Sequence, residues 1–255
     1  MDWVDNGIVL TATAHGETGA IVSVLTEQHG RHPGMVRGRN RLRGVLEPGV
    51  PVVASWRGRL PHHLGQYQLE PRGGALLAAV LDDPARLLAL AAVCQSIHDA
   101  VPERAPYPRL YSGLCGLLVA LEEQDDPLIW GAVLVRWEVG LLAELGFGLD
   151  LNQCAATGRN DQLAYVSPRS GRAVSLSAGE PYHSKMLTLP PFLIGAGTIE
   201  GSDVLAGLAL TGFFLDRMVF AAVNCPLPVA RVQLIDRLTH GFGLTDAGAA
   251  TSNAS

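Results

Sequence analysis

Lysine is nearly absent from this chain, since Lys185 is the one lysine among 19 lysines and arginines. Aromatic residues are also scarce, at 6% of 255 residues, while 48% of the chain is hydrophobic. This composition excludes a disordered chain and favours helices packed through small side chains over a sandwich built on large aromatics. Because arginine supplies almost all the positive charge, its placement is more informative than its number.

Two further absences restrict the class of protein. The four cysteines form no CxxC pair, and a chain of this length and apolar content needs no disulfide framework. The most apolar stretch, residues 204–223, contains the adjacent charged residues Asp216 and Arg217, which favour a buried helix over a membrane span. No basic segment followed by an apolar one opens the sequence, so we predict no signal peptide. We expect a cytoplasmic protein with no membrane partner.

Charge divides the chain into two unequal parts. The whole chain has a formal net charge of -5, yet residues 1–80 hold eight arginines against six acidic residues. The remaining residues hold eleven basic and eighteen acidic groups. This asymmetry predicts two modules with different partners, of which the N-terminal module binds a polyanion.

The first eighty residues read as five short strands joined by turns rich in glycine and proline. β-Branched or alternating runs mark the strands, which we place at 7–16, 18–27, 29–38, 49–60 and 64–71. Five short strands of this kind suit a small closed barrel. We predict an OB-fold, although the pattern alone leaves an SH3-like barrel open.

After residue 80 the hydrophobic period becomes helical. Asp83 before Pro84 has the form of a helix N-cap, and apolar residues follow at helical spacing. We expect about five helices, at 82–101, 107–124, 126–147, 204–223 and 228–240. The predicted fold class is therefore α+β. Its parts are an OB-fold nucleic-acid-binding domain over 1–80, a helical domain over 81–245 with a small hairpin insertion near 154–176, and a flexible tail over 246–255.

One short segment concentrates the positive charge. Residues 29–44, HGRHPGMVRGRNRLRG, contain five arginines, two histidines and no acidic residue. Arg37, Arg39, Arg41 and Arg43 occupy every second position, so on an extended backbone they would form a row spaced about 7 Å apart, near the spacing of phosphates along a strand. In a loop the row would dissolve and the charge would remain. The predicted DNA-binding residues are Arg31, Arg37, Arg39, Arg41, Arg43, Arg57 and Arg59.

The alternative for this segment is a solvated arginine-rich loop with no ligand, as most charge runs are. The barrel context and the lack of intervening acids favour nucleic acid. We see no pattern that reads bases, so binding is expected to be insensitive to sequence and to weaken steeply with salt. Trp56 and Tyr67 are candidates for stacking on bases, with roles in the barrel core equally open.

No catalytic constellation is present. His62 and His63 lack a third metal ligand at suitable spacing, and the HGETGA segment lacks the lysine and the serine or threonine of a phosphate-binding loop. Ser112 lies in no G-x-S-x-G elbow. We expect no enzyme and no cofactor, although an enzyme with an unrecognised site in the helical domain stays open.

The order of motifs along the chain resembles the bacterial recombination mediator family RecO. The matching segments run from residue 7 to about 240 and include TEQHGR, VRGRNR, RWEVGLLAELGFGLDLNQC and YVSPRSGRAVS. The resemblance implies an N-terminal OB-fold, a helical C-terminal domain and a non-enzymatic role in recombinational repair. It also implies binding of single- and double-stranded DNA, annealing of complementary strands, and cooperation with RecR in loading RecA onto DNA coated by single-stranded-DNA-binding protein (SSB).

The sequence departs from part of the RecO family at the predicted hairpin. Some relatives carry a four-cysteine zinc site there, of which Cys154 matches the first ligand while Thr157 stands at the second. The SPRSG turn supplies no further thiol, and His183 and Asp161 are weak substitutes. One thiolate does not hold structural zinc, so we predict a metal-free hairpin.

The resemblance also implies binding of the SSB C-terminal tail through the helical domain. An acidic tail with an apolar tip needs an apolar pocket with a cationic rim. Arg136, beside Trp137, stands where relatives have a basic residue, and Arg109 on the preceding helix is a second candidate. An ordinary surface arginine paired with a nearby acid is an equally good interpretation of Arg136. The competing function for the whole chain is an RNA-binding OB-fold protein, because phosphate contacts do not separate RNA from DNA.

Overall fold

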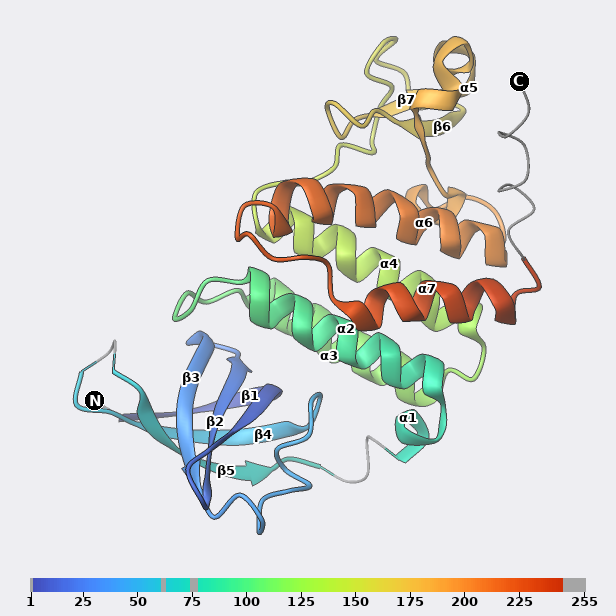
Figure 1. Ribbon diagram of the computed structural model, residues 1–255. Coiled ribbons are helices and arrows are strands. Elements are labelled where there is room, and N and C mark those ends of the chain that lie inside the picture. The colour runs from blue at the N-terminus through green and yellow to red at the C-terminus, as the bar shows by residue number, and fades with distance from the viewer. Residues whose placement is uncertain (1, 61–62, 74–77, 245–255) are drawn as a thin grey trace, which may run out of the picture.

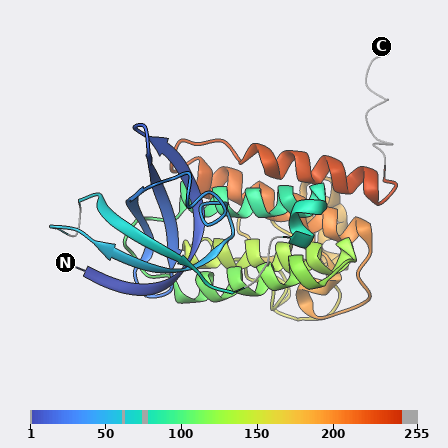
Figure 2. The same ribbon diagram turned by 90° about the horizontal axis from the view of Figure 1, so that it is seen from below.

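The computed structural model describes residues 2–60, 63–73 and 78–244. Figures 1 and 2 show a β-barrel packed at one end of a helical bundle, with a small sheet on the side of the bundle away from the barrel. The predicted flexible tail over 246–255 lies outside the described residues, and the predicted division at residue 80 stays a prediction.

The five predicted strands are confirmed. They are β1 (Asp2–His15), β2 (Gly19–Thr26), β3 (Gly30–Arg37), β4 (Pro51–Arg57) and β5 (Gly65–Pro71). Buried residues alternate with half-buried ones along β3 and with exposed ones along β5, as expected for strands with one face toward a barrel interior.

The strand order identifies the barrel as an OB-fold. The strands close in the order β1-β2-β3-β5-β4, with β1 pairing both β2 and β4. β3 and β5 pair in parallel, whereas the other four pairs are antiparallel. A simple meander would pair only antiparallel strands that follow one another in sequence, so the observed order decides between the two barrels that the sequence left open.

In the described part of the chain, the α-helices match the five predicted segments and add two short ones. The long helices are α2 (Pro84–Ala100), α3 (Pro108–Glu123), α4 (Pro127–Glu144), α6 (Gly201–Phe214), which continues into a π-helical segment over Leu215–Phe220, and α7 (Val229–Gly241). The short ones are α1 (Ala78–Asp82) and α5 (Leu176–Gly179). The Asp83 carboxylate accepts hydrogen bonds from the N–H groups of Ala85 and Arg86, which confirms the predicted N-cap. Across the described residues, none of these helices combines the length and the apolar character that crossing a membrane requires.

The predicted hairpin is present and carries a third strand. β6 (Leu163–Val166) pairs with β7 (Ala173–Ser175) and also with β8 (Leu187–Thr188). A strand of two residues is too short to show an alternating pattern, which is why the sequence did not predict β8.

Barrel and bundle share a hydrophobic interface. Ile8, Leu10 and Leu25 on the barrel belong to the same buried cluster as the helices, whereas a second cluster fills the barrel interior. Gly30 lies at this junction with φ +69°, and a Cβ there would collide with the Ala105 carbonyl.

One ion pair is buried inside the bundle. Arg231 on α7 donates from Nε to Glu138 Oε1 on α4 at 2.7 Å and from Nη2 to Glu138 Oε2 at 2.9 Å. Arg231 Nη2 also donates to the Leu208 carbonyl on α6 at 2.7 Å, and Thr211 Oγ1 donates to Glu138. The side chains of Arg231 and Glu138 are 3% and 5% exposed, so this pair joins three helices out of contact with water.

Candidate nucleic-acid interface

The arginine run does not form the predicted row. β3 ends at Arg37, and Gly38 follows with φ +74°. The chain then folds into successive turns, in which the Arg41 N–H donates to the Gly38 carbonyl at 2.9 Å and the Leu42 N–H donates to the Arg39 carbonyl at 3.1 Å. The extended geometry is therefore wrong for residues 38–46, because a left-handed glycine turns the backbone directly after the strand. The positive charge stays on the surface.

Arg37 and Arg57 come together across β5. Both are exposed at the ends of their strands and line one hollow of about 450 Å³ on the β3–β5–β4 wall of the barrel. The exposed side chains of Gln66 and Gln68 on β5 also line it. An adjoining hollow of about 570 Å³ shares Arg57 and Gln66 with the first and adds Arg59. We call the two together the wall hollow.

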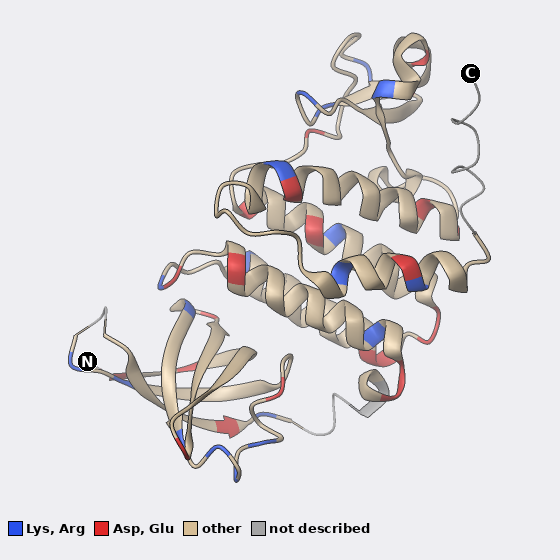
Figure 3. Ribbon diagram, in the orientation of Figure 1, with Lys and Arg blue, Asp and Glu red and all other residues tan. Residues whose placement is uncertain are grey.

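Arg39 and Arg43 line a different hollow. It has a volume of about 390 Å³ and lies between β1, the β3–β4 connection and helix α2. Thr11 from β1 and Gln95 from α2 also line it. We call it the junction hollow. Of the residues that the structure describes, none lines both this hollow and the wall hollow. Figure 3 shows basic segments both along the β3–β4 connection and at the end of β4.

Arg31 has a structural role and lies apart from these arginines. Its Nε donates to the Val101 carbonyl at 2.6 Å, and its Nη1 donates to Glu103 Oε1 at 3.3 Å. Its side chain is 13% exposed, and it lies at the opposite end of β3 from Arg37. Arg31 therefore holds the barrel against the loop after α2, and the sequence grouped it with the run only because it is near in sequence.

Few carboxylates neutralise the remaining arginines. Arg57 Nη2 lies 3.7 Å from Asp2 Oδ2, and because the two side chains are 84% and 71% exposed this pair is weak. Within residues 2–60, 63–73 and 78–244, Arg37, Arg39, Arg41, Arg43 and Arg59 have no carboxylate within 4.0 Å. A protein surface of this kind attracts a polyanion, and salt weakens this attraction by screening the charges.

Trp56 and Tyr67 belong to the barrel core. They are 1% and 7% exposed, with the Trp56 indole donating to the Pro33 carbonyl and the Tyr67 hydroxyl donating to the His32 carbonyl. The stacking role considered for these two rings is therefore wrong. Gln66 and Gln68 were not among the residues predicted from the sequence, although their alternation with the buried Tyr67 was a signal that they face outward.

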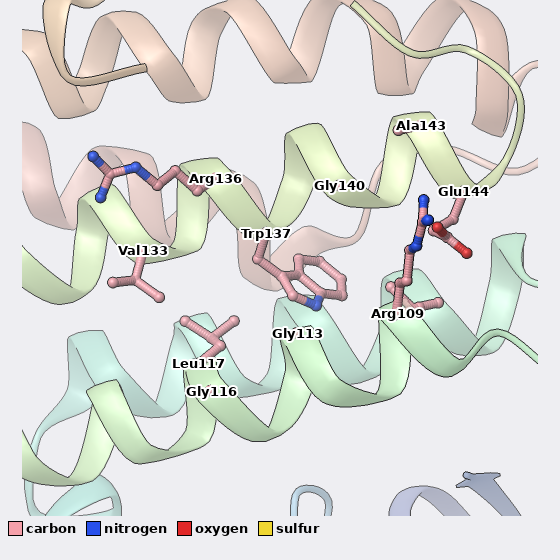
Figure 4. Close-up of a pocket in the computed structure, with 11 residues that line it drawn as sticks. Arg109, Gly113, Gly116, Leu117, Val133, Arg136, Trp137, Gly140, Ala143 and Glu144 are labelled. Atoms are coloured by element: carbon pink, nitrogen blue, oxygen red, sulfur yellow. The ribbon is translucent and has the colours of Figure 1, made fainter. Parts of the chain in front are cut away.

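Arg109 and Arg136 line one groove between α3 and α4. The groove has a volume of about 480 Å³, and its walls are mostly apolar, with glycines at 113, 116 and 140. Figure 4 shows the Arg136 guanidinium directed away from Trp137, while Arg109 lies toward the opposite end beside Glu144. Arg136 donates to the Phe192 carbonyl at 2.8 Å and stacks over the Phe192 ring. The structure thus brings the two predicted residues to one apolar groove, with Arg136 already engaged by Phe192.

The hairpin cysteine is held by hydrogen bonds. Cys154 is buried, its Sγ accepts from the Ser175 N–H at 3.2 Å, and its Sγ lies 3.4 Å from Ser175 Oγ. Burial alone raises the pKa of this thiol, but hydrogen bonds from Ser175 and Thr157 outweigh burial and lower the pKa to about 6. In the part of the chain that the structure describes, no three histidine, cysteine or acidic side chains are grouped to hold a metal ion. The metal-free hairpin stays a prediction.

Comparison with known proteins agrees with this architecture. The N-terminal model of recombination protein O matches residues 1–71, and the C-terminal model of recombination protein O matches residues 81–223. The DNA repair protein RecO of Rhodospirillum centenum is 51% identical over 241 residues, covering 93% of this chain and 94% of that protein. The DNA repair protein RecO of Phenylobacterium zucineum is 49% identical over 243 residues, covering 94% of this chain and 98% of that protein. The OB-fold barrel, the helical bundle and these relatives together show that the chain belongs to the RecO family of DNA repair proteins.

Proposed function

We propose that this protein is a DNA-binding recombination mediator that acts in the cytoplasm without catalysing a covalent reaction. The observation that carries the proposal is the set of exposed or half-buried arginines on two hollows of an OB-fold barrel. Among the described residues, these arginines have one carboxylate within 4.0 Å, in the weak pair of Arg57 with Asp2. OB-folds bind nucleic-acid strands, and arginine contacts to phosphate are independent of base sequence. The relatives are named as DNA repair proteins.

The proposed role has two consequences beyond DNA binding. The protein anneals complementary strands, and together with RecR it helps RecA to load onto single-stranded DNA covered by SSB. Both consequences follow from the RecO family and from a barrel that holds phosphate without reading bases.

Strand annealing by the purified protein tests this proposal. Two complementary oligonucleotides labelled with a donor and an acceptor dye are expected to pair faster with the protein than alone, with no nucleotide triphosphate present. Annealing should slow as salt rises, because salt weakens phosphate contacts. Stronger binding to structured RNA than to single-stranded DNA would support the RNA-binding alternative, and no acceleration of pairing would contradict the mediator role.

The groove between α3 and α4 is the proposed site for the SSB C-terminal tail. Its apolar walls suit an apolar side chain at the end of the tail, and the Arg109 side chain suits a carboxylate. Arg136 contributes by closing one end of the groove while it holds the Phe192 carbonyl. The carboxylate of Glu144 also lines the groove and repels an anion. The cationic character of the groove therefore depends mainly on Arg109.

We expect Arg109→Glu to weaken binding of an acidic, apolar-tipped peptide at least about 10-fold, because the substitution places a second carboxylate in a partly desolvated groove. Binding to single-stranded DNA should change less than about 2-fold, since the barrel arginines are untouched. Fluorescence anisotropy with a labelled tail peptide and with a labelled oligonucleotide measures both. Arg169→Glu, on the exposed turn of the hairpin, is the control for the change of net charge. Equal loss of both ligands in the Arg109 variant would contradict separate sites.

A further inference from the structure

We propose that the barrel holds two nucleic-acid strands at once, one in the wall hollow and one in the junction hollow. This inference rests on the proposed function and adds to it a second strand-binding site on each chain. The starting observation is that five of the seven predicted arginines divide between two hollows, which share no lining residue among the described residues. Arg37, Arg57 and Arg59 line the wall hollow, and Arg39 and Arg43 line the junction hollow.

The backbone accounts for this division. Gly38, with φ +74°, separates Arg37 at the end of β3 from Arg39 in the following turn. The Arg39 N–H donates to the Thr18 carbonyl in the β1–β2 turn at 2.8 Å, which fixes where the turn begins. Arg37 consequently lines the β3–β5–β4 wall, whereas Arg39 and Arg43 face β1 and α2. Glycine takes this left-handed conformation without the strain that a side chain adds. The fold therefore fixes Arg37 on one side of Gly38 and Arg39 on the other, so that they face different hollows.

The two hollows have equivalent chemistry. The part of the wall hollow around Arg37 and Arg57 includes one carboxylate, that of Asp2, and the glutamines at 66 and 68. The junction hollow combines Arg39 and Arg43 with one carboxylate, that of Glu47, and with the Thr11 hydroxyl and the Gln95 amide. Among the described lining residues, the whole wall hollow thus has three guanidiniums, with Arg59 as the third, and the junction hollow has two. Each set stands against one carboxylate and lies beside neutral polar groups of the kind that bind phosphate and sugar oxygens.

The dimensions of the hollows suit a short stretch of single strand. The junction hollow has a volume of about 390 Å³, and the two parts of the wall hollow have volumes of about 450 and 570 Å³. These volumes lie in the range of small-ligand pockets, so each hollow accommodates part of one strand. The wall hollow lies over β3, β5 and β4, and the junction hollow lies between β1 and α2. Two strands held on one small barrel meet at an effective concentration far above that in solution, which accelerates their pairing.

Two matched double variants test this inference. Arg37→Ala with Arg57→Ala removes two of the three guanidiniums of the wall hollow and leaves Arg59, and Arg39→Ala with Arg43→Ala removes both guanidiniums of the junction hollow. The control, Arg169→Ala with Arg237→Ala, removes the same charge from exposed positions of the helical region. Two short non-complementary oligonucleotides, one carrying a donor dye and one an acceptor dye, report whether a single chain holds both.

We expect the parent protein and the control to bind two oligonucleotides per chain, with energy transfer between the dyes. Each double variant should bind one oligonucleotide per chain, lose the energy transfer and anneal complementary strands at least about 10-fold more slowly. The protein mass measured in solution converts the stoichiometry to a value per chain.

A parent protein that saturates at one oligonucleotide per chain and still anneals would overturn the two-strand inference while leaving the proposed function standing. Loss of all binding in either double variant would also overturn it, because that result means one continuous strand path. A parent protein that binds no oligonucleotide would overturn the inference and the proposed function together.

Discussion

Replacing Arg37, Arg39, Arg41 and Arg43 together by alanine is expected to weaken binding to single-stranded DNA at least about 100-fold at moderate salt. These residues supply cations to both hollows and, at Arg41, to the surface beside them. The slope of log affinity against log salt is negative, and each phosphate that the protein no longer neutralises should reduce its magnitude by about 0.7. Removal of four arginines should therefore make the slope less negative by about 3. Fluorescence anisotropy titrations at several salt concentrations measure both quantities.

The control removes the same charge elsewhere. Arg159, Arg169, Lys185 and Arg237 are exposed residues of the helical region, and their joint replacement by alanine leaves the barrel unchanged. This variant should bind with an affinity within about 3-fold of the parent and with nearly the same salt slope. Equal losses in the two variants would mean that net charge drives binding, and an unchanged barrel variant would remove the arginine run from the interface. Circular dichroism checks that both variants are folded.

Arg231→Ala is expected to lower the free energy of unfolding by about 3–5 kcal/mol. The substitution leaves the Glu138 carboxylate buried without its cation, and the Leu208 carbonyl loses a donor. Burial lowers the pKa of the Arg231 guanidinium, but attraction to Glu138 outweighs burial and raises this pKa overall, so the guanidinium is charged in the folded protein. Urea unfolding followed by circular dichroism measures the change.

A double variant separates loss of packing from loss of charge pairing. Arg231→Met with Glu138→Leu removes both charges and keeps an apolar filling of similar size, so it should be much more stable than Arg231→Ala. A single variant that loses less than about 1 kcal/mol would show that water reaches Glu138 and that the pair does not join α4, α6 and α7 as described.

The elements that the sequence predicted are those that local chemistry determines. Asp83 followed by Pro84 marked the start of α2, and alternation of apolar and polar residues marked β5. Glycines and prolines separated the strands of the barrel. β8 was missed because two residues carry no period.

The sequence indicated which arginines are candidates for the site, but it did not predict how they are arranged in space. Arginine at every second position is compatible with a strand and with a turn, and only the left-handed conformation of Gly38 decides for the turn. Arg31 belongs to the same sequence segment but reaches Glu103, 72 residues away. Likewise nothing in the local sequence pairs Arg231 with Glu138, which lies 93 residues earlier. Contacts between residues so far apart in sequence depend on tertiary structure. The periodicity of the sequence predicts only local elements and therefore does not predict these contacts.

Photo-crosslinking of single-stranded DNA to the protein, followed by mapping of the crosslinked peptides, tests most directly that the barrel is the nucleic-acid interface. We predict that the crosslinks lie in peptides from β1, the β3–β4 connection and the segment from Arg57 to Gln68, with α2 contributing at Gln95. Crosslinks confined to α3, α4, α6 and α7 would contradict it.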